Sequence, residues 1–171
     1  MDTAQSGVTV SIVMGSQSDE DTMSKTAQVL SEFGISHEMR VISAHRTPEK
    51  AHEFGRSARD RGTKVIIAGA GKAAHLAGVL ASLTTLPVIG VPMKTSDLGG
   101  LDSLLSTVQM PGGIPVATTA IGSSGAKNAA LLAVAILALM DQGLADKLED
   151  YRKNMADAVE KDDRKVRENA Q

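Results

Sequence analysis

Short apolar runs alternate with segments of helical spacing along most of this chain, and that alternation restricts the folds it can adopt. The run "KVIIAGA" at 64–70 is almost continuously apolar, which is typical of a strand covered on both faces of a parallel sheet. Between such runs, apolar residues recur every three or four positions, as in Met23, Ala27 and Leu30, which indicates a helix. The predicted strands are 8–14, 35–42, 64–70, 87–91 and 115–121, and the predicted helices are 20–33, 48–62, 73–84 and 124–141. This order predicts an α/β protein with three layers, α/β/α, around a doubly wound parallel sheet.

The chain closes with a charged segment of helical pattern at about 144–171. A length of 171 residues suits one domain with a sizeable core, so we predict a single domain over 1–171 that carries a C-terminal helical tail. The longest apolar run, "AALLAVAILALM" at 129–140, is too short to span a bilayer, and we expect no membrane association.

Charge and aromatic content argue against a nucleic-acid partner. The formal net charge is −2, so no broad positive field attracts phosphate backbones. Aromatic residues make up only 2% of the chain, which leaves almost no surface for stacking bases. The chain has no cysteine, and its first residues, "MDTAQSG", lack the basic and apolar regions of a secretory leader. We therefore expect a cytoplasmic protein without disulfides. No cluster has metal-ligand spacing, so we expect no metal.

The candidate chemistry lies in loops that follow the predicted strands, where ligands bind in such folds. "GSQSD" at 15–19 combines a flexible glycine, two hydroxyls and the start of a helix, a pattern that binds phosphate or another anion. Asp19 does not suit a phosphate contact, but its carboxylate can accept hydrogen bonds from sugar hydroxyls. The alternative is purely structural: Ser18 or Asp19 caps the helix, and Glu20 and Asp21 complement its dipole.

"SAHRTP" at 43–48 is more specific. Arg46 provides a permanent fork-shaped cation suited to phosphate. His45 can both give and take a proton near neutral pH, which suits general acid–base catalysis. Thr47 as the N-cap and Pro48 as the first helical residue would fix the exit of the loop. The alternative for His45 is an ordinary hydrogen-bonded loop histidine.

"GAGKAAHLAG" at 69–78 surrounds another histidine, His75, with small residues that permit close approach to a flat ligand. The spacing is not that of a dinucleotide-binding GxGxxG motif, so a dinucleotide fold is only weakly supported. His75 is expected inside the early part of the helix, where a lone histidine can also be structural. His37 and His52 have no partnering motif, and we interpret both as structural.

Together, these loops resemble one known family. "GSQSD", "SAHRTP", "AGAGKAAHLAG" and "GLDSLLSTVQMPGGIPVAT" are similar to the N5-carboxyaminoimidazole ribonucleotide mutases of de novo purine biosynthesis, the PurE family. The resemblance extends from about Val8 to about Arg152, and "AAHL" resembles the bacterial mutase class. It implies an isomerase that moves the carboxylate of a ribonucleotide from N5 to C4 without metal or organic cofactor. It also implies a homo-octamer in which C-terminal segments reach neighbouring subunits.

The resemblance further implies a role for each site residue. His45 matches the general acid/base of the family. Arg46, Ser18 and Ser43 would hold the 5′-phosphate side, and Asp19 would accept hydrogen bonds from the ribose hydroxyls. The remaining substrate-binding positions implied are Ser16, Gly71, Ala73, His75 and Leu76, the last four lining the base and carboxylate pocket.

Three positions depart from the pattern of the family. Lys72 stands where the family usually has glycine, so a lysine is strained there if the backbone needs a positive φ angle. The alternative is that the Lys72 side chain points to solvent. Ala77 stands where the family usually has proline, and Glu20 where it often carries an aromatic residue.

Two other functions fit the same residues. One is direct, carbon-dioxide-dependent carboxylation of aminoimidazole ribonucleotide. The other is a non-catalytic sensor of nucleotides or phosphosugars with a flavodoxin-like fold. Such a sensor needs the Ser16–Asp19 loop and Arg46 but has no use for His45.

Overall fold

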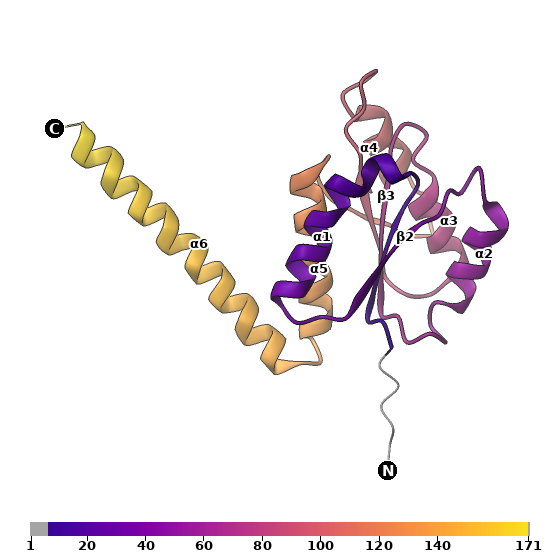
Figure 1. Ribbon diagram of the computed structural model, residues 1–171, viewed down its shortest axis with the longest axis horizontal. Helices are drawn as coiled ribbons and strands as arrows, with labels where there is room; N and C mark the ends of the chain where they lie inside the picture. Colours follow the sequence, from indigo (N-terminus) through magenta and orange to yellow (C-terminus); the bar gives the residue numbers. More distant parts are fainter. Residues whose placement is uncertain (1–6, 171) are drawn as a thin grey trace, which may run out of the picture. The chain divides into compact units, whose positions relative to one another are not determined.

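The computed structural model describes residues 7–170, and its centre is a parallel sheet with the strand order β2-β1-β3-β4-β5 (Figure 1). The strands are β1 (Val10–Met14), β2 (His37–Val41), β3 (Val65–Ala70), β4 (Val88–Pro92) and β5 (Ala117–Thr118). This order and the parallel pairing confirm the predicted doubly wound parallel sheet, and the strand order is that of flavodoxin-like folds. All but the last residue of the segment "MDTAQSG", which lacks a leader pattern, lie outside the described residues.

Helices cover both faces of the sheet, as the three-layer prediction requires. In chain order, the helices of the described residues are the 3-10 helix η1 (Gln17–Asp19), α1 (Glu20–Glu32), α2 (Pro48–Ser57), α3 (Leu76–Leu83), α4 (Leu101–Val108), α5 (Ser123–Ala138) and α6 (Gln142–Asn169). Helices α2 and α3 lie side by side on one face (Figure 1). On the other face, Thr26 Oγ1 of α1 donates a hydrogen bond of 2.9 Å to the carbonyl of Ala126 at the start of α5.

The core lies between the central strands and the helices. Strands β1 and β4 are buried at every position, as expected for strands in the middle of a covered parallel sheet. Phe54 of α2 and Leu80 of α3 pack with Ile66 of β3 in one hydrophobic cluster. Burial of each such side chain contributes roughly 1.5–3 kcal/mol. This packing fixes the ends of the strands, from which the site loops extend.

Several predicted boundaries were wrong for local reasons. Strand β5 covers only two of the seven residues predicted at 115–121, and Pro115 near its start has no N–H to donate. Helix α2 ends at Ser57 rather than Gly62, because the chain turns through Gly62 with a φ angle of 91°. Helix α4 is absent from the predicted elements, although Leu101, Leu105 and Val108 have helical spacing.

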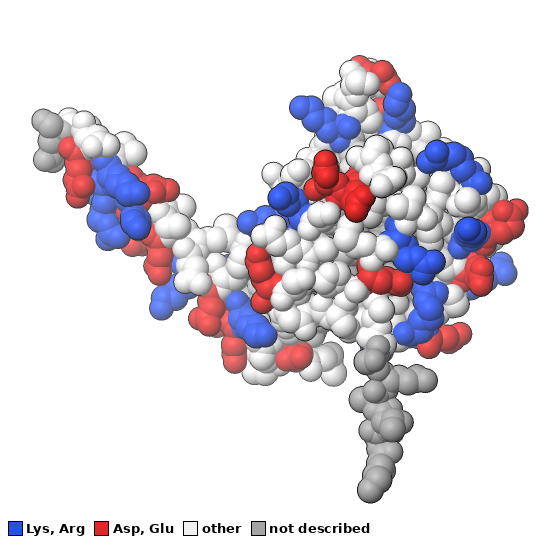
Figure 2. Space-filling view, viewed as in Figure 1, with Lys and Arg blue, Asp and Glu red and all other residues white. Residues whose placement is uncertain are grey.

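The chain divides into two compact units, one ending at Ala133 and one beginning at Val134. Within the second unit, the predicted tail is the single helix α6, whose start is capped by Asp141 accepting from the Leu144 N–H at 3.1 Å. Charges of both signs alternate along α6, and none of its residues is buried in the single chain (Figure 2). No helix among residues 7–170 is long and apolar enough to cross a membrane.

Candidate functional site

The loops after β1, β2 and β3 enclose a cavity of about 270 Å³ at the carboxyl edge of the sheet. Its lining contains eight of the ten predicted site residues and all of the predicted titratable ones. The lining residues are Gly15, Asp19, Ser43, Ala44, His45, Arg46, Ala70, Gly71, Ala73, His75 and Leu76. Ser16 and Ser18 belong to the loop after β1 but do not line the cavity. The lining residues come from three loops that are far apart in the sequence, and together these loops enclose one ligand-sized space.

The β1–α1 loop is held by its own hydroxyls. Ser16 Oγ accepts from the Ser18 N–H at 3.3 Å, and Ser18 Oγ donates to Ser16 Oγ at 3.0 Å. Asp19 occupies the N-cap position of α1, but its carboxylate makes no capping hydrogen bond. The structural interpretation of Ser18 or Asp19 as the capping side chain is therefore wrong, and the Asp19 carboxylate faces the cavity instead.

Asp19 lies in a partly buried position that affects its ionisation. Burial raises the pKa of this carboxyl above its usual value, while the hydrogen bonds with the Ser18 side chain and the Ser16 backbone partly oppose that effect. A ligand that supplies hydroxyl donors would stabilise this partly buried carboxylate by hydrogen bonding to it.

The β2–α2 loop is folded around Ser43. Its Oγ accepts from the Arg46 N–H at 3.1 Å, and Thr47 Oγ1 donates to the Ser43 carbonyl at 2.9 Å and accepts from the Ser43 N–H at 3.1 Å. Thr47 does occupy the N-cap position and Pro48 the first helical position, as predicted. The expectation that the Thr47 side chain caps α2 is wrong, because its hydroxyl closes the loop instead.

Arg46 joins the first two loops. Its Nη2 donates to the Gly15 carbonyl at 3.0 Å, and its Nε lies 3.4 Å from Ser43 Oγ. These bonds hold the guanidinium plane at the cavity wall while the N–H groups of Nη1 remain available to a ligand. A fixed guanidinium with spare donors is suited to phosphate or carboxylate.

His45 and His75 form a hydrogen-bonded pair across the cavity. His45 Nε2 lies 2.9 Å from His75 Nδ1, and the rings meet edge to face with centroids 4.9 Å apart. One of these two nitrogens must carry a proton and the other must accept it, so the bond couples the tautomers of the two rings. His75 was predicted inside the helix, but it occupies the N-cap position before α3, which begins only at Leu76.

The β3–α3 loop turns sharply before it reaches His75. Lys72 has a φ angle of 57°, the only positive value at a non-glycine among the described residues. The expected backbone strain is therefore present. The Lys72 side chain also points to solvent, as the alternative expected, and its Nζ lies 2.6 Å from Asp97 Oδ2. Gly71 is closely packed, since an added Cβ would lie 3.3 Å from the Met93 side chain.

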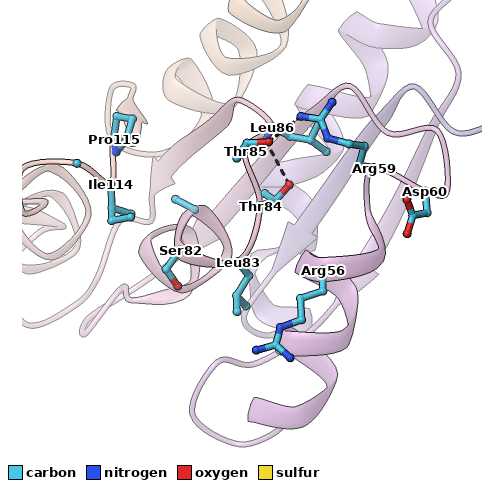
Figure 3. Close-up of a pocket in the computed structure, with 12 residues that line it drawn as sticks. Arg56, Arg59, Asp60, Ser82, Leu83, Thr84, Thr85, Leu86, Ile114 and Pro115 are labelled. Carbon is cyan, nitrogen blue, oxygen red and sulfur yellow. Dashed lines mark hydrogen bonds between the residues drawn. The ribbon is translucent and has the colours of Figure 1, made fainter.

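A larger cavity of about 670 Å³ lies elsewhere and is a poorer candidate (Figure 3). It is bordered by Leu83 at the end of α3 and by Pro115 before β5, so it lies at the amino edge of the strands. Its cations, Arg56 and Arg59, come from the end of α2 and the turn beyond it, where the helix dipole is negative. It has no histidine and no acid–base pair, and we assign the chemistry to the smaller cavity.

The sequence predicted most of the side chains that line this cavity but not their backbone partners. The Gly15 carbonyl that holds Arg46 and the small wall formed by Ala44 and Ala70 were not predicted. A carbonyl acceptor leaves no trace in residue type, and the packing of alanines depends on the register of the strands. Among residues 7–170, no group of three or more His, Cys, Asp or Glu is arranged to hold a metal ion.

The sequence and the fold are similar to those of known proteins. Residues 9–158 match the family described as AIR carboxylase. A protein of Pyrococcus abyssi named N5-carboxyaminoimidazole ribonucleotide mutase is 60% identical over 146 residues, covering 85% of this chain and 83% of that protein. A Bacillus subtilis protein of the same name is 56% identical over 150 residues, covering 88% and 93%. The crystal structure of Treponema denticola PurE superposes with a TM-score of 0.82 at 34% identity, covering 91% of this chain and 96% of that one.

Proposed function

Because this chain belongs to the AIR carboxylase family, we propose that it is an isomerase of de novo purine biosynthesis that converts N5-carboxyaminoimidazole ribonucleotide to 4-carboxy-5-aminoimidazole ribonucleotide. Its curated relatives carry the name of that mutase. The observation that supports this most directly is the His45–His75 pair in a cavity that also holds Arg46.

The substrate is held at its phosphate and ribose ends. Arg46 binds the 5′-phosphate through the guanidinium N–H groups that Gly15 and Ser43 leave available, with Ser18 and Ser43 on the same side. Ser16 completes the phosphate loop. Asp19, which makes no capping bond, accepts hydrogen bonds from the ribose hydroxyls. Binding at this remote end orients the base for reaction at the histidines.

The reaction moves one carboxylate and two protons. The N5–carbon bond breaks, its electron pair stays on the nitrogen, and His45 delivers a proton there as carbon dioxide is released. C4 of the ring then attacks the carbon dioxide and forms the new carbon–carbon bond. His45, now unprotonated, removes the C4 proton and returns to its initial state. One group that both gives and takes a proton therefore suffices, and His75, 2.9 Å away, holds the tautomer of His45.

Carbon dioxide must stay beside the ring between the two steps. Gly71, Ala73 and Leu76, with His75, form the base and carboxylate pocket, and the small residues Gly71 and Ala73 leave a space suited to a small molecule. A confined site without bulk water keeps the carbon dioxide available for recapture.

Assembly would complete this confinement. His45, Arg46 and His75 are exposed in the single chain, although the chemistry requires a closed site. We place the chain, as one catalytic domain with α6 packing on a neighbour, in a cytoplasmic homo-octamer that acts without metal or organic cofactor.

The direct test uses pure protein with each nucleotide, with and without added bicarbonate. We expect conversion of the N5-carboxylated nucleotide at the same rate in both conditions. The second candidate is the carbon-dioxide-dependent carboxylase, which the name of the AIR carboxylase family favours. An absolute requirement for bicarbonate, with turnover of aminoimidazole ribonucleotide itself, would replace our proposal with that one.

A further inference from the structure

The Lys72 backbone is strained and is held from two directions. A φ angle of 57° is unfavourable for any residue with a Cβ. The Lys72 N–H donates to Ser103 Oγ at 2.9 Å, and Ser106 Oγ donates to the Lys72 carbonyl at 3.2 Å. Both serines belong to α4, and Ser103 is fully buried. Helix α4 thus anchors the turn of the β3–α3 loop.

The Lys72 side chain adds a third connection, to the β4–α4 loop. Its Nζ lies 2.6 Å from Asp97 Oδ2. This loop is itself ordered by Thr95, whose Oγ1 donates to Asp102 at 2.9 Å and accepts from the Gly100 N–H at 3.1 Å. Asp97 is therefore presented by an organised loop rather than by a free chain.

Residues of the active site lie immediately on either side of this connection. Gly71 packs on Met93 and Thr95, and Ala73 and His75 line the cavity. A displacement of Lys72 therefore moves the residue that hydrogen-bonds to His45.

We propose that the Lys72–Asp97 ion pair is a clasp that holds the β3–α3 loop against the β4–α4 loop in its reactive conformation, so that Lys72 is a positioning residue for His75. This inference rests on the proposed isomerase function, because it gives the loop position a consequence for turnover.

The electrostatics make the clasp sensitive to salt rather than to pH near neutrality. The hydrogen bond with Asp97 raises the pKa of Lys72, and the same bond lowers the pKa of Asp97, so both groups stay charged over a wide pH range. Both side chains are more than half exposed, at 68% and 59%, and dissolved salt weakens such a pair.

The test compares Lys72→Met, Asp97→Asn and the double variant with the parent protein. If the clasp positions His75, each single variant lowers kcat by about twofold to fivefold with a smaller change in KM. The double variant then resembles either single one, because both remove the same interaction. Lys72→Arg keeps the ion pair and should restore kcat. Lys72→Gly also relieves the backbone strain, so its kcat/KM should change by less than about tenfold.

Lys94→Met is the matched control. Lys94 is an exposed cation of the β4–α4 loop for which the described part of the chain shows no ion pair, so its replacement removes one charge and leaves the clasp intact. We expect parental kcat for this variant. Salt at about 1 M should lower the kcat ratio of parent to Lys72→Met toward one, since salt then screens the ion pair in the parent and the variant already lacks it.

The proposal would be overturned if Asp97→Asn and Lys72→Met changed KM in opposite directions. If Lys72 contacts the anionic substrate directly, freeing it from Asp97 lowers KM, while Lys72→Met raises it. Amide hydrogen exchange provides a readout that does not depend on turnover: residues 71–75 should exchange faster in Lys72→Met and Asp97→Asn than in Lys94→Met. Equal exchange in all variants also overturns the clasp, whereas a parent protein inactive on the N5-carboxylated nucleotide refutes the proposed function.

Discussion

At the scale of single residues, His45 distinguishes an enzyme from a nucleotide sensor. Its ring shares a hydrogen bond with His75, although 30 residues separate them. We expect His45→Asn to lower turnover by about 100-fold or more, because a positioned acid–base group contributes at least that factor. Nucleotide binding, measured by calorimetry, should largely survive.

His52→Asn is the control for this substitution, because His52 is an exposed residue of α2 outside the cavity. Its turnover should equal that of the parent protein. Near-parental turnover in His45→Asn would instead show that the acid–base assignment is wrong, and retained binding would then support the sensor.

Asp19 gives a prediction about pH and stability. Burial raises its pKa in the folded protein above the usual 3.8, so the folded state binds the proton more tightly than the unfolded state. The stability associated with this carboxyl is therefore present at low pH and lost as pH rises through the raised pKa. Asp19→Asn removes that loss, and we expect its Tm to exceed that of the parent at pH 7 and to match it near pH 3.

Thermal unfolding followed by circular dichroism between these pH values tests this. Asp21→Asn serves as the control, because Asp21 is an exposed residue in the first turn of α1, where a negative charge is favourable. It should show no gain at pH 7. A Tm difference for Asp19→Asn that is constant with pH would contradict the account.

At the scale of elements, the start of α5 depends on a close backbone approach. A Cβ added at Gly125 would overlap the Ala120 carbonyl group, which cannot move like the end of a flexible side chain. Thr119 Oγ1 also donates to the Gly125 carbonyl at 3.0 Å, which fixes the first turn in place. We therefore expect Gly125→Ala to destabilise the protein by at least about 1–3 kcal/mol, the usual cost of overpacking.

Urea unfolding of Gly125→Ala measures this loss. Gly112→Ala is the matched control, because nothing lies within 4 Å of its added Cβ and no left-handed φ angle is involved. It should unfold within about 0.5 kcal/mol of the parent. Equal midpoints for the two variants would mean that α5 shifts freely to accept the methyl group.

At the scale of the whole molecule, helix α6 is the element that bears on subunit assembly. It is 28 residues long, yet none of them is buried in the single chain. Most helical stability in proteins comes from packing of an apolar face, and α6 carries exposed apolar residues at Met155, Val159 and Val166. These features support a helix that packs on a neighbouring subunit.

A chain ending at Asp141 tests that role. Light scattering should give a mass of eight 17.8 kDa chains for the full-length protein and a smaller assembly for the truncated one. Circular dichroism should show that the unit ending at Ala133 remains folded, because its core is formed without α6. A truncated protein that still contains eight chains would contradict this role of α6.

The sequence by itself determined the layers and the chemistry-bearing loops. Alternation of apolar runs and helical spacing predicts parallel strands with crossover helices, and the carboxyl ends of such strands meet at one edge. For this reason the sequence alone predicts that His45, Arg46 and Asp19 lie at one site. These signals are local, since they depend on residue type and spacing within a few turns.

Only the tertiary structure decided how those residues act on one another. The hydrogen bond between His45 and His75, the contact of Arg46 with the Gly15 carbonyl and the ion pair of Lys72 with Asp97 each join separate loops. Their geometry depends on strand register, on the start of α3 at Leu76 and on the positive φ angle of Lys72. The packing of the whole sheet sets these quantities, and no short stretch of sequence contains them.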